Sequence, residues 1–198
     1  GLFGAMNGFF VAYMEVPAFV ATLAGMTIAR GFAYVYSDGK PYTLNSPKFR
    51  IIGQGMAPII IFLAILLICH IVLSKMKFGR YIYATGGNIK AAEASGVNTK
   101  KILMKVYILA GTLSGIAGIV LASRTNSGQP AVGTGFETDA IAAAVIGGTS
   151  MTGGIGTIPG TLVGILIIGT LNNSLNLLNV SSYYQQIIKG IIILGAVC

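Results

Sequence analysis

The sequence predicts an all-α integral membrane protein with several spanning helices, and two features of its composition lead to this fold class. Of its 198 residues, 54% are hydrophobic and only 9% are charged, whereas a soluble domain carries about 25% charged residues to keep its surface hydrated. The charges are also unevenly placed, since none lies between Asp139 and Lys189 or within residues 51–74 and 106–123. Each of these stretches reaches or nearly reaches the roughly 20 residues that one helical crossing of a bilayer requires.

The first half of the chain is expected to hold three spans. Residues 1–14 are apolar and rich in glycine, which favours the end of one span, and Pro17 favours the first turn of a second helix over residues 17–36. Several turn-forming residues lie within residues 37–54 and predict an exposed loop. Residues 56–73 carry no formal charge and form the plainest span of the sequence.

A basic segment follows this span. Seven of the thirteen Lys and Arg residues lie between Lys75 and Lys105, with Glu93 as the single acidic residue among them. Lys and Arg close to the ends of spans remain on the cytoplasmic side of the membrane, so residues 75–102 are predicted to be a cytoplasmic loop. The net charge of +8 does not indicate nucleic-acid binding, because the basic residues are not interleaved with stacking aromatics.

The next span is expected over residues 103–123, followed by an external loop over residues 124–138. Small residues lie on one face of this span and would let another helix approach closely. They are Gly111, Gly115, Gly118 and Ala122.

A broken helix is the unusual feature of the second half. Residues 139–146 are apolar but too short to cross a bilayer, and the glycine-rich residues 147–156 follow them. Non-helical backbone at membrane depth persists only where protein or water satisfies its peptide groups, and in transporters such breaks commonly line a path. A full span is expected over residues 159–178, and a last span begins near Gln185 after a polar external turn.

The sequence contains no motif for catalysis of its own. It has no phosphate-binding loop, zinc-binding histidine pair or nucleophile elbow. Cys69, Cys198 and the single His70 are too scattered to indicate a disulfide or a metal site. We therefore expect no catalytic residues, no metal ligands and no cofactor, so that energy for any work must come from a partner or a gradient.

A ladder of amides lies on one face of the span at residues 159–178. Asn172, Asn176 and Asn179 recur at helical spacing. Two interpretations remain open: the amides form hydrogen bonds between helices, or they offer transient binding to an uncharged, hydroxyl-rich solute. Asp139 has a similar ambiguity, because a carboxylate at a helix N-terminus also stabilises the helix dipole.

Longer stretches of the chain resemble the permease subunit of bacterial ABC importers for simple sugars such as ribose, galactose and xylose. The resemblance is carried by GRYIYATGGNIKAAEASGVNTKKI at residues 79–102, by residues 122–164 and 172–190, and by VPAFVATLAGMTIARG at residues 16–31. It implies a multi-span helical bundle of the importer permease type. The chain begins at Gly1 without a methionine and ends within an apolar run, so residues 1–198 are expected to be one permease domain, incomplete at both ends.

The resemblance also implies partners and site residues. The partners are a cytoplasmic ATP-binding subunit, a periplasmic sugar-binding protein, a second permease copy and a monosaccharide, with the lipid bilayer around them. ABC permeases dock on the ATPase through a Glu-Ala-Ala pattern followed three residues later by Gly. In this sequence Lys90 stands where the pattern has Glu, so the residue at this position cannot form the salt bridge to the ATPase that a Glu would form. Glu93, three residues later, is the candidate to replace that Glu.

Two sets of site residues follow from these arguments. The predicted ATPase-coupling residues are Lys90, Ala91, Ala92, Glu93, Ala94, Ser95, Gly96 and Val97. The predicted residues of the translocation path are Gly147, Gly148, Thr149, Ser150, Asn172 and Asn176.

The hypothesis is ATP-driven import of a monosaccharide by a transporter subunit that is not itself an enzyme. One alternative is a passive channel or structural membrane subunit without ATPase coupling. A second alternative is an intramembrane enzyme, which the scarcity of paired ionisable groups disfavours.

Overall fold

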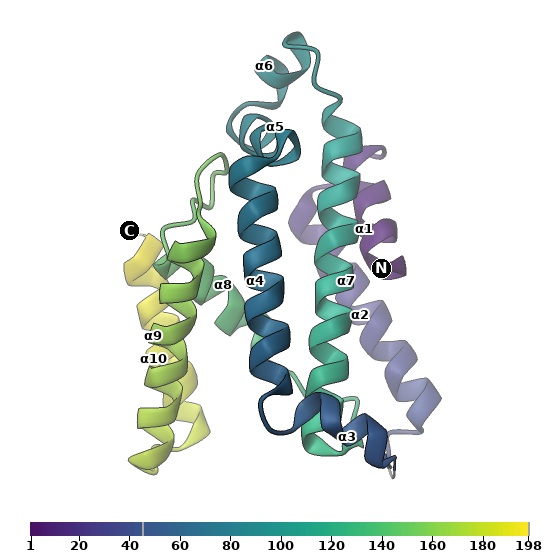
Figure 1. The fold of residues 1–198 in the computed structure, drawn as a ribbon, viewed down its shortest axis with the longest axis vertical. Coiled ribbons are helices and arrows are strands. Elements are labelled where there is room, and N and C mark those ends of the chain that lie inside the picture. The colour runs from purple at the N-terminus through teal and green to yellow at the C-terminus, as the bar shows by residue number, and fades with distance from the viewer. Residues whose placement is uncertain (45, 198) are drawn as a thin grey trace. The chain divides into compact units, whose positions relative to one another are not determined.

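The computed structural model describes residues 1–44 and 46–197, and helices make up most of this part of the chain (Figure 1). Four of the described helices are long and apolar enough to cross a membrane: α2 (Ala18–Ser37), α4 (Ala57–Lys75), α7 (Thr99–Thr125) and α9 (Ile158–Leu177). The shorter helices are α1 (Leu2–Ala12), α3 (Pro47–Gly53), α5 (Lys77–Gly87), α6 (Ile89–Ala94), α8 (Phe136–Ile146) and α10 (Ser182–Val197). The predicted all-α membrane fold with a broken helix is therefore confirmed.

The chain divides into two compact units. The first comprises residues 1–67 and 92–132, and the second comprises residues 68–91 and 133–198. Many large apolar side chains are exposed on the surface of each unit, and α4 has no buried residue. A helix of this hydropathy with so much exposed apolar surface requires a lipid or protein environment, because exposing that surface to water costs free energy.

Glycines hold α1 against α7 in the first unit. A Cβ atom on Gly4 would collide with the carbonyl oxygen of Tyr107, and one on Gly111 would lie 2.7 Å from the Cα of Gly4. The predicted close approach along the small-residue face is thus confirmed at Gly111. At Gly115 and Gly118 a Cβ would meet no described atom within 4 Å, so for these two residues the close approach stays a prediction.

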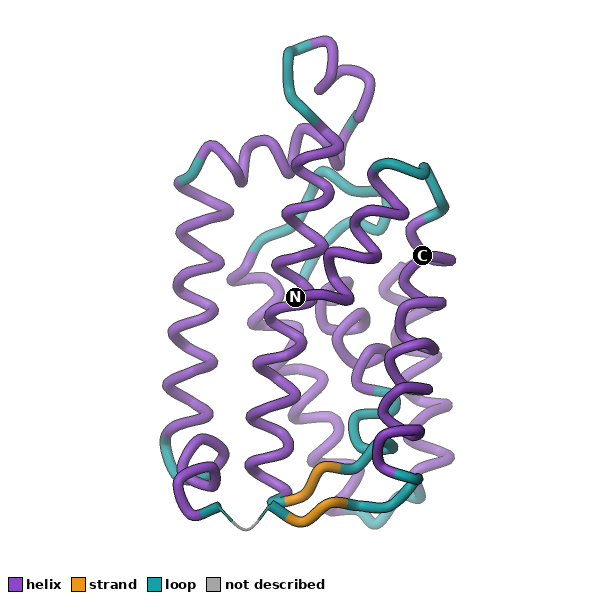
Figure 2. Tube along the Cα trace, turned by 90° about the vertical axis from the view of Figure 1, so that its right-hand side faces the viewer, coloured by secondary structure: helices purple, strands orange, loops and turns teal. Residues whose placement is uncertain are grey.

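The segment predicted as an exposed loop over residues 37–54 is more ordered than expected. It contains α3 and the strand β1 (Tyr42–Thr43), which pairs antiparallel with β2 (Ser127–Gly128) just after α7 (Figure 2). The hydroxyl of Ser123, which is fully buried, donates a hydrogen bond of 2.5 Å to the carbonyl oxygen of Phe49. Tertiary contacts with the end of α7 order this segment, and its turn-forming residues did not reveal them.

The second unit is built around α8 and α9. Its small core consists of Ala142, Ala143 and Ile168, with Ile193 of α10 packed against it. A Cβ on Gly164 would collide with the carbonyl oxygen of Ala143, so the two helices touch at backbone distance. The short helix predicted at residues 139–146 is confirmed, although it begins three residues earlier.

Several predicted boundaries differ from the structure. The last span begins at Ser182 rather than near Gln185, and α7 begins at Thr99 rather than residue 103. The segment predicted as a cytoplasmic loop contains the short helix α6. A second helix in that segment, α5, was not predicted, because its basic residues were taken as the mark of a cytoplasmic loop.

Candidate functional site

The helix break lies between α8 and α9, at residues 147–157, here called the glycine loop. Its backbone takes positive φ angles at Gly148, Gly153 and Gly154, with values of 82°, 93° and 75°, which residues with a Cβ rarely adopt. The loop also closes on itself, because the amide of Ser150 donates a hydrogen bond of 3.0 Å to the carbonyl oxygen of Ile155. Internal bonds of this kind are what non-helical backbone needs at membrane depth.

The glycine loop is attached to the last turn of α5. The hydroxyl of Tyr83 donates a hydrogen bond of 2.5 Å to the carbonyl oxygen of Gly156. Beside it the two backbones touch: a Cβ on Gly86 would lie 2.8 Å from the amide nitrogen of Gly154, and one on Gly153 would collide with the carbonyl oxygen of Gly86. Only glycine permits this approach.

A cavity of about 400 Å³ lies beside this contact. Its wall is mostly apolar, with hydroxyl groups and glycine backbone placed between the apolar side chains. The residues that bring hydroxyl groups to it are Tyr83, Thr149, Ser150, Thr157 and Thr161. A mostly apolar wall with a few polar groups is the usual composition of a site for a small molecule.

The predicted path residues fall into two groups. Thr149 and Ser150 line the cavity, whereas Gly147 packs against the backbone of Gly160 at the start of α9. Asn172 and Asn176 do not line it. They belong instead to a set of polar side chains that we call the polar cluster: Asp139, Asn172, Asn176, Gln185 and Lys189.

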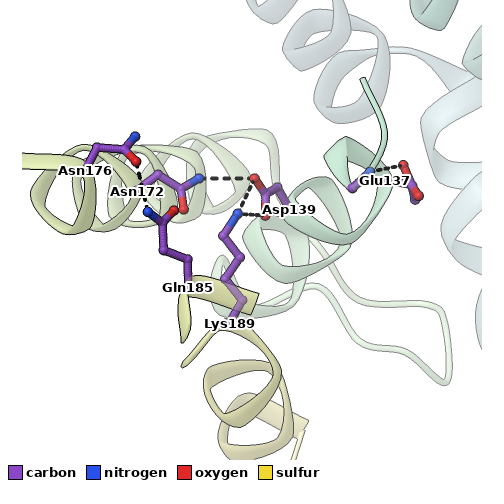
Figure 3. Close-up of polar contacts among 7 residues, drawn as sticks. Glu137, Asp139, Asn172, Asn176, Gln185 and Lys189 are labelled. Atoms are coloured by element: carbon purple, nitrogen blue, oxygen red, sulfur yellow. Dashed lines mark hydrogen bonds and ion pairs between the residues drawn. The ribbon is translucent and has the colours of Figure 1, made fainter. Parts of the chain in front are cut away.

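An ion pair is at the centre of the polar cluster (Figure 3). The Nζ atom of Lys189 on α10 lies 2.8 Å from Oδ1 and 3.0 Å from Oδ2 of Asp139 in the first turn of α8. Nδ2 of Asn172 on α9 donates to the same carboxylate at 3.1 Å. The two charged side chains are only 19% and 22% exposed, so each needs the other as its counter-ion.

The amides of the cluster form hydrogen bonds between helices. Oδ1 of Asn176 accepts a hydrogen bond of 2.9 Å from Nε2 of Gln185, which also donates to the carbonyl oxygen of Val180. The predicted shared face is wrong for Asn179, because α9 ends at Leu177 and Asn179 has a φ of 52° outside the helix. The hydrogen-bonding interpretation is confirmed for Asn172 and Asn176.

Sequence reasoning missed the two residues that α10 brings to the cluster, Gln185 and Lys189. One signal was available for Lys189, since it and Asp139 are the charges that bound the longest charge-free stretch. Two isolated opposite charges within membrane-embedded segments are usually partners. No comparable signal pointed to Gln185.

The predicted coupling residues, called here the coupling segment (residues 90–97), comprise α6 without its first residue and the three residues that follow the helix. Oε1 of Glu93 accepts a hydrogen bond of 2.5 Å from the hydroxyl of Thr99, and Gly96 turns the chain with a φ of 81°. Most of the segment is exposed, but Ala92 is only 4% exposed and is unsuited to direct contact with a partner. Ile89, which was not predicted, is 49% exposed at the start of α6.

Comparison with known proteins identifies the family. The family model described as "Branched-chain amino acid transport system / permease component" matches residues 1–197. The chain belongs to this permease family. Together with its four helices of membrane-spanning length, membership places it in the bacterial inner membrane as a multi-pass protein. No solved structure gave a significant match.

Individual relatives carry more specific names. The chain is 47% identical to the ribose import permease protein of Haemophilus influenzae over 99% of its own length and 64% of the relative's. It is 48% identical to the ribose import permease protein of Bacillus subtilis, over 96% of the chain and 62% of the relative. The L-arabinose transport system permease protein of Escherichia coli is 43% identical, over 97% and 60%. The chain therefore spans somewhat less than two thirds of the length of these relatives.

Proposed function

We propose that the chain is the larger part of the permease subunit of an ATP-driven monosaccharide importer. The observation that carries this proposal is the identity of 47% with a ribose import permease across 99% of the chain, which includes both the coupling segment and the glycine loop. Relatives named for ribose, L-arabinose and D-allose are all at least 40% identical. This spread supports simple sugars as the substrate class without favouring one sugar.

The partners of the proposed importer would meet the chain at different faces. A separate ATP-binding subunit would hydrolyse ATP and dock on the coupling segment, with the exposed Ile89 as an additional apolar contact. A periplasmic sugar-binding protein would deliver the sugar on the opposite side, and a second permease copy would complete the path. The orientation rests on the basic residues 75–102, which favour the cytoplasmic side.

The glycine loop and the polar cluster are the proposed path elements. Thr149 and Ser150 would meet the sugar in the cavity, while Gly147 and Gly148 shape the backbone around it. Asn172 and Asn176 would contribute through the cluster, if its helices part during transport. A solute shifts a two-state equilibrium only through its differential affinity for the two states, so a weakly binding path requires ATP and the docked binding protein to supply the bias.

The orientation is tested by labelling an introduced cysteine. Ala94 is a suitable position because it is exposed on α6, unlike the buried Ala92. After Cys69 and Cys198 are replaced with serine, an impermeant maleimide should label Ala94→Cys in inverted vesicles but not in intact cells. Leu178→Cys, at the end of α9 beside the predicted external turn and 74% exposed, should show the reverse. Labelling of Ala94→Cys from outside would overturn the importer model.

The substrate class and the energy source are tested by uptake. Cells that lack their own ribose permease should accumulate labelled ribose when they produce the complete permease with its ATP-binding subunit and binding protein. Excess unlabelled sugar should compete, whereas leucine should not, which separates the sugar hypothesis from the amino-acid transport named in the family description. Equilibration without accumulation, and without ATP, would favour the passive channel instead.

The role of α6 in docking is tested separately by Ile89→Asp. Because Ile89 is exposed, a charge at this position should leave the fold intact and release the ATP-binding subunit during co-purification. Leu178→Asp is the control, because this exposed position beside the predicted external turn should have no influence on the subunit. Equal recovery of the ATP-binding subunit with both variants would argue against docking at α6.

A further inference from the structure

The helix α5 connects α4 to the coupling segment without an intervening loop. Asn88 is the single residue between α5 and α6, and it serves both helices. Its amide donates a hydrogen bond of 3.1 Å to the carbonyl oxygen of Ala84 in α5, and its Oδ1 accepts one of 3.0 Å from the amide of Ala91 in α6. Because Asn88 is hydrogen-bonded to both helices, a displacement of α6 should be transmitted to α5 through this one residue, here called the joint.

The same end of α5 holds the glycine loop. Tyr83 and Gly86 lie three residues apart, which places them on one face of the helix. Tyr83 bonds to the carbonyl oxygen of Gly156, and Gly86 meets Gly153 and Gly154 at backbone distance. The contact contains a single hydrogen bond and no interlocking side chain between the glycines, so it positions the loop and yet can separate at moderate cost.

The glycine loop in turn is continuous with the helices on both of its sides. At its start Gly147 packs against the backbone of Gly160, and at its end the hydroxyl of Thr157 accepts a hydrogen bond of 3.1 Å from the amide of Gly160. The cavity lined by Thr149 and Ser150 lies at this junction. Contacts thus run without interruption from the joint at Asn88, through α5, to the loop and the cavity wall.

We propose that the last turn of α5 is a positioning element, in which Tyr83 and Gly86 make the conformation of the glycine loop follow that of the coupling segment. The proposal rests on the proposed function, because it assigns to α5 the transmission of the ATP-driven movement. It differs from docking itself, since neither Tyr83 nor Gly86 belongs to the coupling segment. Along the chain, more than fifty residues separate α6 from the glycine loop. The contact through α5 is therefore the shorter connection between them.

Two pairs of variants separate positioning from general effects on folding. Tyr83→Phe removes only the oxygen that bonds to Gly156, and Tyr81→Phe removes an oxygen from an exposed position on the same helix. Gly86→Ala places a Cβ 2.8 Å from the amide nitrogen of Gly154, whereas Gly87→Ala places one 4.0 Å from the nearest atom. Within each pair the chemical change is identical, and only the contact with the loop differs.

The readout is the accessibility of the loop itself, measured in the complete importer in proteoliposomes. Met151→Cys, 68% exposed in the loop, is introduced after replacement of Cys69 and Cys198, and its labelling rate is measured before and after trapping with ATP and vanadate. Trapping should change the rate in the otherwise unsubstituted protein. Tyr83→Phe should reduce this change in labelling rate by about fivefold, which is the effect of losing one typical hydrogen bond. The amount of sugar transported per ATP hydrolysed should fall by the same factor.

Each outcome decides between the proposals. The positioning role is supported if Tyr83→Phe and Gly86→Ala reduce the ATP-dependent change in labelling rate while the ATP-binding subunit stays attached. Tyr81→Phe and Gly87→Ala should then show the same change as the unsubstituted protein. An unaltered change in all four variants overturns that role and leaves the proposed function standing. No response to ATP in the unsubstituted protein overturns both. If Gly86→Ala does not assemble, the milder Tyr83→Phe decides.

Discussion

The two ends of α8 are held in place by different kinds of interaction. At its N-terminal end, the carboxylate of Asp139 is bonded to Lys189 and Asn172, so that charge joins α8 to α9 and α10. At its C-terminal end, glycine backbones meet: Gly147 lies against Gly160, and beyond it the glycine loop rests on α5. One end depends on electrostatics among polar side chains, and the other on the absence of side chains.

This difference indicates which end is the fixed one. Separating a poorly solvated ion pair leaves two charges without partners, which costs several times more than the loss of one neutral hydrogen bond. Backbone contacts between glycines carry no such penalty, and the loop can move as long as its own hydrogen bonds persist. The N-terminal end of α8 is therefore expected to act as an anchor, while its C-terminal end and the glycine loop adapt.

The largest effect is expected where α8 and α9 touch. Gly164→Ala would bring a Cβ against the carbonyl oxygen of Ala143, forcing the helices apart at a cost of about 3 kcal/mol or more. Gly169→Ala on the same helix meets open space and should be neutral or slightly stabilising. Thermal unfolding in detergent, followed by size-exclusion chromatography, measures both. Equal midpoints for the two variants would show that this contact does not hold the helices.

The anchor itself is tested by Lys189→Met. The unpaired carboxylate of Asp139 should destabilise the protein by about 2 kcal/mol, less than for a fully buried pair because both side chains are partly exposed. The double variant Asp139→Asn with Lys189→Met should recover much of the loss, since no charge remains unpaired. A double variant no more stable than Lys189→Met alone would contradict the ion-pair explanation.

A smaller effect is expected from the amide in the same cluster. Asn172→Leu removes a hydrogen bond to the Asp139 carboxylate and should lower the unfolding free energy by about 1 kcal/mol. Asn173→Leu changes an exposed neighbour on α9 and should cause no loss. The same unfolding assay applies, and a larger loss from Asn173→Leu would mean that this helix faces its partners differently.

The smallest effect serves as a reference for the ion pair. Lys40 and Asp38 lie 3.3 Å apart, but their side chains are 78% and 88% exposed. Lys40→Met should leave the unfolding midpoint unchanged within error, because water solvates each charge well without its partner. A loss as large as that of Lys189→Met would indicate that exposure does not distinguish the two pairs.

Much of the fold could be predicted from the sequence. The spans around α2, α4, α7 and α9 follow from apolar stretches of sufficient length, and the break after α8 follows from a short apolar stretch before clustered glycines. These features depend on residues that are neighbours in the chain. Transfer of a helix into lipid is a property of its own composition, so that a local pattern is enough to predict it.

The site depends on contacts that composition does not encode. The sequence marked the loop and the asparagines, but not the pairing of Asp139 with Lys189, the contact of Tyr83 with Gly156 or the burial of Ala92. Residues far apart in the chain meet in each of the first two cases, and the burial of Ala92 exists only in the folded chain. Hydropathy acts on each segment separately, whereas hydrogen bonds and ion pairs require distances and directions that exist only after the helices have packed.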